Sequence, residues 1–184
     1  AIGYYGNQTQ LCNETTTGDD SFLSKICQAW EDATLPFEEL QIPVAKVRLG
    51  IVLGNGRGAF KELMAPLPYK LAAIPGSGKQ IYSWIHIEDA CRIFYNLSQQ
   101  HKTGVFNAVA PHPATMDNLI DEMRYYYPSW LRFHVPEFLL KFILGEMAIE
   151  VTKSTKVSSR KIEDIGFNFH FPTLQEALQN LISS

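Results

Sequence analysis

The chain is short of cysteine, and the few it has are scattered. Its 184 residues contain three cysteines, Cys12, Cys27 and Cys91, with wide spacing and no C-x-x-C pair. An odd, dispersed set argues against a disulfide scaffold and against a zinc site, and it is typical of proteins in the reducing cytosol. We therefore expect a cytoplasmic protein with no bound metal.

Long apolar runs and basic clusters are also missing. The longest apolar candidate, Phe138 to Leu144, is interrupted by Lys141 and falls far short of the roughly 18 residues that cross a bilayer. Lysine and arginine total 16 against 19 acidic residues, which gives a net charge of -3, and no run of them builds a basic face. These absences argue against membrane insertion and against nucleic-acid binding.

What the sequence does contain is ordinary globular composition, with 46% hydrophobic and 19% charged residues. Apolar residues at helical spacing predict a helix over 21–34, capped by Asp20, and the run Pro43–Leu53 reads as a buried parallel strand. Gly104–Ala110 reads as a second buried strand. Further helices are expected at 59–64, 88–100, 115–127, 136–153 with a break near Gly145, 158–165 and 173–182. This order predicts an α/β fold with a helical appendage.

The segment Gly54–Ala59 satisfies the pattern G-x-G-x-x-A between a strand and a helix. In a dinucleotide fingerprint such small residues let the backbone approach the pyrophosphate at a helix N-terminus. No strand with a ribose-binding acid follows about 20 residues later, as the fingerprint requires. A simple strand-to-helix turn is the alternative interpretation, and we favour it.

Three motifs together suggest a family. Gly76–Asp89 resembles the G-x-G-x-x-x-x-(aromatic)-I-H-V-x-D segment of extended short-chain dehydrogenases/reductases, the epimerase/dehydratase superfamily. Arg48–Gly54 (R-x-G-I-V-L-G) and Leu144–Met147 are similar to an atypical branch, the YfcH-like epimerase-family proteins. Each motif is weak singly, but the set is specific and covers nearly the whole chain.

The resemblance implies a fold and a division of the chain. We expect the C-terminal portion of a doubly wound Rossmann-type parallel sheet with a small, mostly helical substrate lobe, and without the N-terminal phosphate-binding half. Residues 1–110 would belong to the Rossmann-like domain, with a substrate-lobe insertion at about 66–86. Residues 111–184 would form the helical C-terminal substrate lobe.

The resemblance also places the catalytic pair of the superfamily, Y-x-x-x-K, on the first helix. Trp30-Glu31 matches the acid that follows this pair, which puts Cys27 at the lysine position and Leu23 at the tyrosine position. Ala1 falls where the catalytic serine usually stands. The ordinary proton-transfer pair, in which an ammonium lowers the pKa of a phenol, is therefore missing.

At matching positions the resemblance implies a cofactor pocket. Leu23 would line its nicotinamide side, and Leu49, Gly50 and Ile51 would lie near the nicotinamide ring, where Gly50 permits close approach. Plain core packing is an equally good interpretation of Leu49 and Ile51.

The substrate side would be the segment Lys79, Gln80, Tyr82 and Trp84. Tyr82 stands where nucleotide-sugar epimerases carry the arginine that grips the diphosphate, which weakens the case for such a substrate. Tyr82 and His86 are the candidate acid–base residues, although a histidine between Ile85 and Ile87 is more often structural.

The sequence thus predicts part of an NADP-dependent oxidoreductase or epimerase-like protein that acts on an unknown small molecule. The alternative is an NADP-binding regulatory or sensor module without chemistry. We expect this chain alone not to hold NADP, and to pair with the N-terminal half of the same protein or with a copy of itself.

Overall fold

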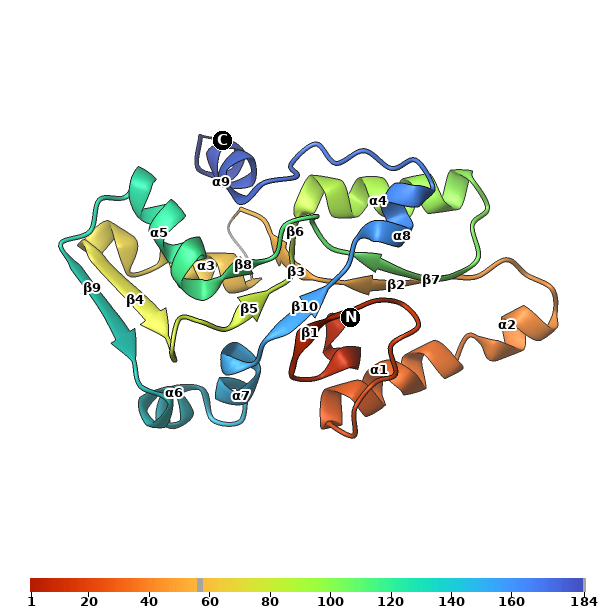
Figure 1. Cartoon of the computed structure of the whole chain (residues 1–184), viewed down its shortest axis with the longest axis horizontal. Helices are drawn as coiled ribbons and strands as arrows, with labels where there is room; N and C mark the ends of the chain where they lie inside the picture. Colours follow the sequence, from red (N-terminus) through yellow and green to blue (C-terminus); the bar gives the residue numbers. More distant parts are fainter. Residues whose placement is uncertain (56–57, 184) are drawn as a thin grey trace.

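The structure is a computed structural model that describes residues 1–55 and 58–183. Figure 1 shows an elongated molecule in which short strands run through the middle and helices lie above and below them. The N-terminus lies near the centre, and the C-terminus ends on the outermost helix at the top of this view.

The elements alternate along the chain as an α/β fold does. The strands are β1 (Gln8–Cys12), β2 (Ala45–Leu49), β3 (Ile51–Leu53), β4 (Leu71–Pro75), β5 (Ile81–Tyr82), β6 (Trp84–His86), β7 (Gly104–Ala108), β8 (Ala114–Thr115), β9 (Leu131–Val135) and β10 (Thr155–Val157). The α-helices are α1 (Phe22–Asp32), α2 (Leu35–Glu39), α3 (Gly58–Met64), α4 (Ile87–Gln99), α5 (Met116–Tyr126), α6 (Glu137–Leu144), α7 (Met147–Thr152), α8 (Arg160–Asp164) and α9 (Leu174–Ser183). Short 3-10 turns form η1 (Ile2–Tyr5) and η2 (Leu67–Tyr69).

The apolar run 43–53 forms two strands, not the single strand that we expected. β2 pairs in parallel with β7 from Ala45↔Gly104 to Leu49↔Ala108, and β3 pairs in parallel with β6 from Ile51↔Trp84. The chain changes partner at Gly50, whose N–H still bonds to Ala108 while the next N–H bonds to Ser83. The second strand that we expected, at Gly104–Ala110, is present as β7 and is the neighbour of β2.

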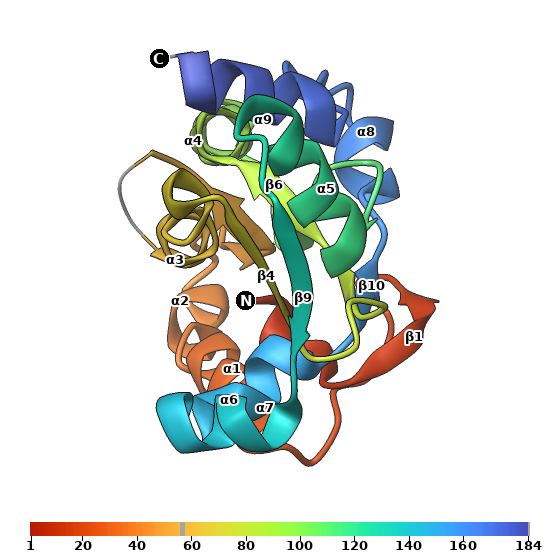
Figure 2. The same ribbon diagram turned by 90° about the vertical axis from the view of Figure 1, so that its left-hand side faces the viewer.

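Residues 111–184 contain more than helices, which corrects the expectation of a helical lobe. β10 joins β1 and β5 in the order β1-β10-β5-β8, and β9 pairs in parallel with β4. Figure 2 shows β4 and β9 side by side, with α5 against them and α6 and α7 below. The segment after α7 therefore returns to the strands of the first part of the chain.

Helix ends follow the sequence signals closely. Thr115 caps α5 by accepting the N–H of Asn118, and Thr173 with Glu176 forms a capping box before α9. At α1 the cap is Ser21, one residue after the expected Asp20, because its hydroxyl accepts the N–H of Ser24.

Beside a small cluster of Tyr5, Cys12, Val109 and Val157, the described residues form two large apolar cores. One packs α5 and α9 against β4 and β6; its largest fully buried members include Trp84, Ile74, Ile120, Met123 and Leu178. The other packs α4 and α8 against β6 and β7; its members include Ile85, Ile93, Phe106 and Ile162.

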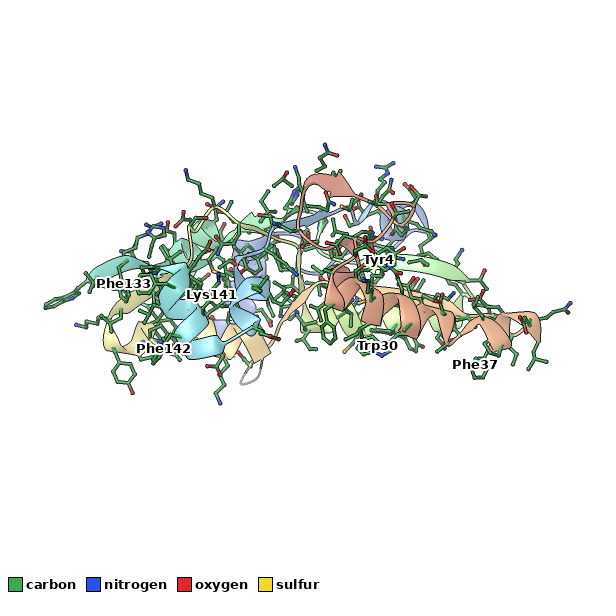
Figure 3. All side chains as sticks on the ribbon, turned by 90° about the horizontal axis from the view of Figure 1, so that it is seen from below. Tyr4, Trp30, Phe37, Phe133, Lys141 and Phe142 are labelled. Atoms are coloured by element: carbon green, nitrogen blue, oxygen red, sulfur yellow. The ribbon has the colours of Figure 1, made fainter. Side chains whose placement is uncertain are left out.

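The apolar stripe of α1 faces outward. Phe22 is 77% exposed and Trp30 is 67% exposed, whereas the buried residues of this helix are Ser24 and Cys27. Figure 3 shows Trp30, with Phe37 of α2, on the underside of the molecule. Among the described residues, no helix has both the length and the apolar character that a membrane span needs.

Candidate functional site

The backbone is closely packed at Gly50, the point where the chain leaves β7 and joins β6. A Cβ on Gly50 would lie 2.6 Å from the carbonyl oxygen of Ser83 and 2.9 Å from Val109. Both neighbours are buried and cannot retreat easily. The strands β2 and β7 end together here, and ligands of parallel sheets bind beyond such carboxyl ends at a switch in strand order.

Three of the four residues predicted to face a nicotinamide ring lie at this point, and Leu23 lies on α1. Leu49, Gly50 and Ile51 are all half-buried, so they keep some surface open. Leu23 of α1 is also half-buried and packs on η1, with its Cβ 3.4 Å from the position of a Cβ on Gly3. The turn η1 also contacts β2.

A buried ion pair that sequence reasoning missed holds these elements together. Arg48 of β2 donates from Nε and Nη2 to the two carboxylate oxygens of Glu31 at 2.7 and 2.8 Å. It also donates to the hydroxyl of Tyr5 at 3.0 Å, and Tyr5 donates to Asn107 of β7 at 2.7 Å. The guanidinium lies 3.4 Å from the ring centroid of Tyr4.

This network explains two motif residues. Glu31 is the acid that the resemblance places after the missing pair, and Arg48 opens the R-x-G-I-V-L-G motif. The side chain of Arg48 is 3% exposed, and a buried cation needs a partner. An arginine within a run of apolar strand residues was the sequence signal that could have revealed this pair. Burial raises the pKa of Tyr5 despite the hydrogen bond and charge of Arg48, so its phenol stays neutral.

Two of the predicted substrate residues are closed off from ligands. The hydroxyl of Tyr82 donates to the backbone oxygen of Val151 in α7, and Gln80 donates to Pro75 at 2.6 Å and to Val151 at 3.4 Å. Burial raises the pKa of Tyr82 to about 12. The structure therefore does not favour Tyr82 as an acid–base residue.

Of the other two predicted substrate residues, Trp84 is buried and Lys79 is exposed. Trp84 is 1% exposed and its indole donates to the backbone oxygen of His112 at 2.9 Å, which makes it a core residue. Lys79 is exposed in the turn before β5. Of the four predicted substrate residues, Lys79 alone presents its side chain to solvent.

His86 acts as a structural cap. It is 2% exposed, its Nδ1 accepts the N–H of Glu88 at the start of α4, and its ring lies 3.8 Å from that of Phe171. Burial lowers its pKa, against the charges of Asp89 and Glu88. The interpretation of His86 as a packed, hydrogen-bonded residue agrees with these contacts.

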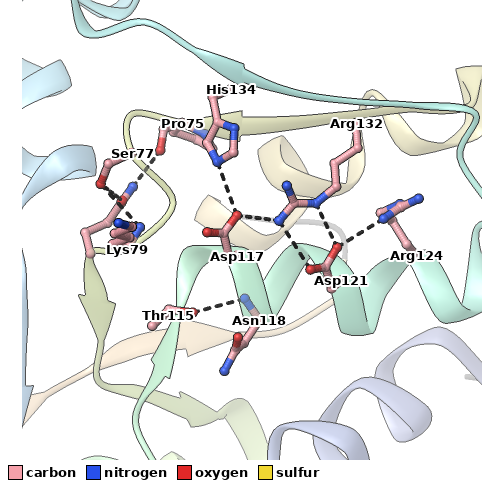
Figure 4. Close-up of polar contacts among 11 residues, drawn as sticks. Pro75, Ser77, Lys79, Thr115, Asp117, Asn118, Asp121, Arg124, Arg132 and His134 are labelled. Carbon is pink, nitrogen blue, oxygen red and sulfur yellow. Dashed lines mark hydrogen bonds and ion pairs between the residues drawn. The ribbon is translucent and has the colours of Figure 1, made fainter.

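A network of charged residues joins α5 to β9. Figure 4 shows Arg132 of β9 between Asp117 and Asp121 of α5, with N–O distances of 2.6 and 3.1 Å. Arg124 adds a second contact to Asp121 at 3.1 Å, and His134 lies 3.3 Å from Asp117. These cations are already neutralised, so they offer little to an anionic ligand.

An open cleft beside α1 is acidic. Its volume is about 500 Å³, and its lining consists of Tyr4, Thr17, Gly18, Asp19, Asp20, Gln28, Glu31 and Asp32. Glu31 is paired with Arg48, but Asp19, Asp20 and Asp32 repel phosphates, so this cleft does not suit the pyrophosphate of a dinucleotide. The G-x-G-x-x-A segment cannot be assessed, because Gly56 and Arg57 lie outside the described residues.

Comparison with known proteins finds epimerase-family proteins that are similar to nearly the whole chain. A family model described as a domain of unknown function (DUF1731) matches residues 135–181. The epimerase family protein SDR39U1 homolog, chloroplastic, of Arabidopsis thaliana is 34% identical over 99% of this chain and 53% of its own length. Epimerase family protein YfhF of Bacillus subtilis is 32% identical over 100% of this chain and 61% of its own length.

A solved structure agrees with these relatives. The crystal structure of human epimerase family protein SDR39U1 (isoform 2) with NADPH superimposes with a TM-score of 0.89 and 29% identity. The match covers 99% of this chain and 63% of the human chain. The chain thus spans between about half and two thirds of the length of the proteins it resembles.

Proposed function

Because the chain belongs to the NAD(P)-dependent epimerase family of atypical extended short-chain dehydrogenases/reductases, we propose that it forms part of an NADP(H) site that serves oxidoreductase or epimerase-like chemistry. In this proposal Leu23, Leu49, Gly50 and Ile51 lie on the nicotinamide side. When bound, the cofactor would exchange a hydride with an unknown small molecule.

The observation that carries this proposal is the switch at Gly50. Two parallel strands end together there, and a position without a side chain lies between half-buried apolar residues. A flat, uncharged ring fits such a surface, because it needs close backbone approach and apolar contact more than charge. The NADPH in the human relative supports the choice of cofactor.

We further propose that the sheet continues past β2 with a strand of a preceding segment, so that this chain is the C-terminal part of a doubly wound fold. Within residues 1–55 and 58–183, β2 has β7 as its one strand neighbour. A free edge and the outward apolar stripe of α1 both call for a covering layer. The cofactor's phosphates would bind in that segment, and residues 1–110 and 111–184 would be the cofactor side and the substrate side.

Calorimetry on the native gene product tests the cofactor. We expect NADPH to bind with micromolar or tighter affinity, and the 184-residue polypeptide alone to show no measurable binding. Absence of binding to the native gene product contradicts the proposed function. Binding to the isolated 184 residues contradicts the need for a preceding segment. It would favour Gly54–Ala59 as the pyrophosphate-binding turn.

A second function is favoured by the residues at the positions of the catalytic pair. Leu23 and Cys27 carry no group that transfers a proton to a carbonyl oxygen at neutral pH, and Cys27 is buried. A protein that binds NADP and signals its redox state needs no such group. Turnover of any member of a carbonyl panel with NADPH supports the enzyme, whereas tight binding without turnover supports the sensor.

A further inference from the structure

One segment near the end of the chain packs against both large apolar cores. This strap, Gly166–Thr173, leads from α8 to α9, and Figure 1 shows it running past α4. Phe167 is a buried member of the core of α4 and α8, and Phe169 packs against the same core. Phe171 packs against the core of α5 and α9. The strap therefore connects the two cores through its phenylalanines.

Asp89, in the first turn of α4, binds the backbone of the strap. It is fully buried, and its two carboxylate oxygens accept the N–H groups of His170 and Phe171, each at 2.9 Å. Arg92 donates to Asp89 at 2.5 Å and to the backbone oxygen of Asn168 at 2.9 Å. Hydrogen bonds to an ionised carboxylate are among the stronger ones in proteins. This acid, the last residue of the I-H-V-x-D motif, thus attaches the strap to α4.

His86 lies where α4, the strap and α9 meet. Its Nδ1 accepts the N–H of Glu88 at 3.2 Å, its ring lies 3.8 Å from the ring of Phe171, and Asn180 of α9 interacts with it. A ring nitrogen that accepts an N–H carries no proton, so the contact with Glu88 requires the neutral ring. A proton on Nδ1 would face a donor, beside the positive end of the helix dipole. Protonation of His86 therefore breaks the cap of α4 in the turn where Asp89 holds the strap.

From these contacts we infer that His86 and Asp89 form a pH-sensitive latch, in which protonation of His86 loosens the start of α4 and releases the strap. Release would let α9 and the core to which it belongs move relative to the core of α4 and α8. The latch goes beyond the proposed function and does not depend on it, because all of its contacts lie within this chain.

The charged groups around the latch act in both directions. Burial lowers the pKa of His86, against the charges of Asp89 and Glu88, and Arg92 offsets part of the charge of Asp89. The Nδ1 of His170 lies 2.7 Å from a carboxylate oxygen of Glu88, and protonation of His170 strengthens this exposed pair. Because the closed latch holds His86 with a lowered pKa, the open latch takes up a proton more readily. Opening therefore grows as the pH falls below about 6.5, the ordinary histidine value.

Hydrogen exchange of the native gene product, followed by NMR and corrected for the intrinsic pH dependence of exchange, tests the latch. Between pH 7.5 and 5.5 we expect the protection of the His170 and Phe171 amides to fall about tenfold, as uptake of one proton with a pKa of about 6.5 requires. His86→Asn should abolish this fall, because asparagine keeps an acceptor for the cap and does not titrate. The matched control is His101→Asn, at an exposed histidine with φ 48°, and it should keep the fall.

Titration of the His86 ring in the parent protein gives a second readout that needs no variant, and its midpoint should lie below about 6.5. A midpoint above that value, or unchanged protection of the strap, overturns the latch. So does a fall that persists in His86→Asn but disappears in His170→Asn, because it would assign the titration to the pair with Glu88. Equal protection of the strap and of β7 at pH 5.5 would also overturn it, since the strap would then open only by global unfolding.

Discussion

At the scale of single residues, the structure depends on Arg48 more than on any catalytic group. Its guanidinium ties η1, α1 and β2 together, and through Tyr5 it reaches β7. A buried pair of this kind is costly to form and more costly to break, because removing one partner leaves an uncompensated charge. It fixes α1, the helix that carries Leu23, relative to β2, the strand that Gly50 follows.

Replacing Arg48 should therefore lower the stability of the fold. We expect Arg48→Met to lower the free energy of unfolding by about 3 kcal/mol, because Glu31 and Tyr5 lose their donor. The surface pair Arg160–Asp164, with side chains 78% and 55% exposed, supplies the control. Arg160→Met should cost less than about 1 kcal/mol. Urea denaturation of the native gene product measures both.

The double variant Arg48→Met/Glu31→Leu sharpens the interpretation. It removes both charges, so it should recover part of the stability that Arg48→Met loses. A single variant within 1 kcal/mol of the parent, or a double variant less stable than the single one, would show that the pair does not hold α1 in place.

His86 gives the fold a pH dependence of definite sign. Burial lowers its pKa in the folded state, so below the ordinary histidine pKa of about 6.5 the unfolded chain takes up a proton more readily than the folded one. Stability from this residue is complete above that pH and declines as the pH falls toward the folded-state value. Asp89 and Glu88 oppose the shift but do not reverse it.

The variant His86→Asn should remove this dependence. Asparagine keeps an acceptor for the N–H of Glu88, so the cap survives while the titration is lost. Chemical denaturation at pH 7.5 and 5.5 should show a smaller loss of stability in the variant, by at most the linkage of about one proton. Equal losses in both proteins would rule out His86 as the group responsible.

At the scale of elements, the position where β2 gives way to β3 decides the shape of the candidate site. The chain can leave β7 and join β6 here because the backbone at Gly50 passes within contact of Ser83 and Val109. Any side chain would push these strands apart.

Gly50→Ala should consequently destabilise the native gene product by about 2 kcal/mol, within the usual range for overpacking, and weaken NADPH binding. Gly54→Ala is the matched control, since its Cβ would meet the Ile87 side chain at 3.3 Å instead of a backbone oxygen. Thermal unfolding and calorimetry measure the two effects. Similar values for both variants would mean that the approach at Gly50 is not special.

Most of the helices could be predicted from sequence, whereas α2 and the short strands could not. Caps such as Thr115 and the Thr173–Glu176 box are local signals, so the elements they begin were expected within a residue or two. β10 has three residues and pairs with β1, far away in sequence, so no local pattern reveals it. For the same reason the sequence did not reveal that the hydroxyl of Tyr82 is used inside the fold, because its partner Val151 is 69 residues away.

In the candidate site, too, some predictions from motifs agree with the structure and others do not. Gly50 and its neighbours followed from a motif, and the structure puts them at a strand switch. Tyr82 and Trp84 belonged to an equally clear motif, yet their polar atoms bond to backbone carbonyls of distant segments. A motif shows which residues stand together along the chain, whereas burial depends on contacts that the sequence does not display.

At the scale of the whole molecule, the surface is too apolar for the polypeptide to remain isolated. The outward side chains of α1, α2 and the residue after α2 include Phe22 at 77%, Trp30 at 67%, Phe37 at 52% and Leu40 at 72% exposure. They lie beside a strand with one described neighbour, and an open edge next to apolar helices is a template for association.

The isolated 184-residue polypeptide should therefore associate in solution, by pairing with a copy or by aggregation, and a preceding segment of the native gene product should suppress this. Sizing chromatography with light scattering over a range of concentrations measures it. Replacing both Trp30→Lys and Phe37→Lys should shift the polypeptide toward monomer, because charges on the stripe oppose its burial, whereas Tyr125→Lys on α5, 78% exposed, should leave the distribution unchanged. A sharp-unfolding monomer at every concentration would show that β2 and the α1–α2 surface need no cover. The proposed extension of the sheet would then be wrong, because the edge would already be stable in water.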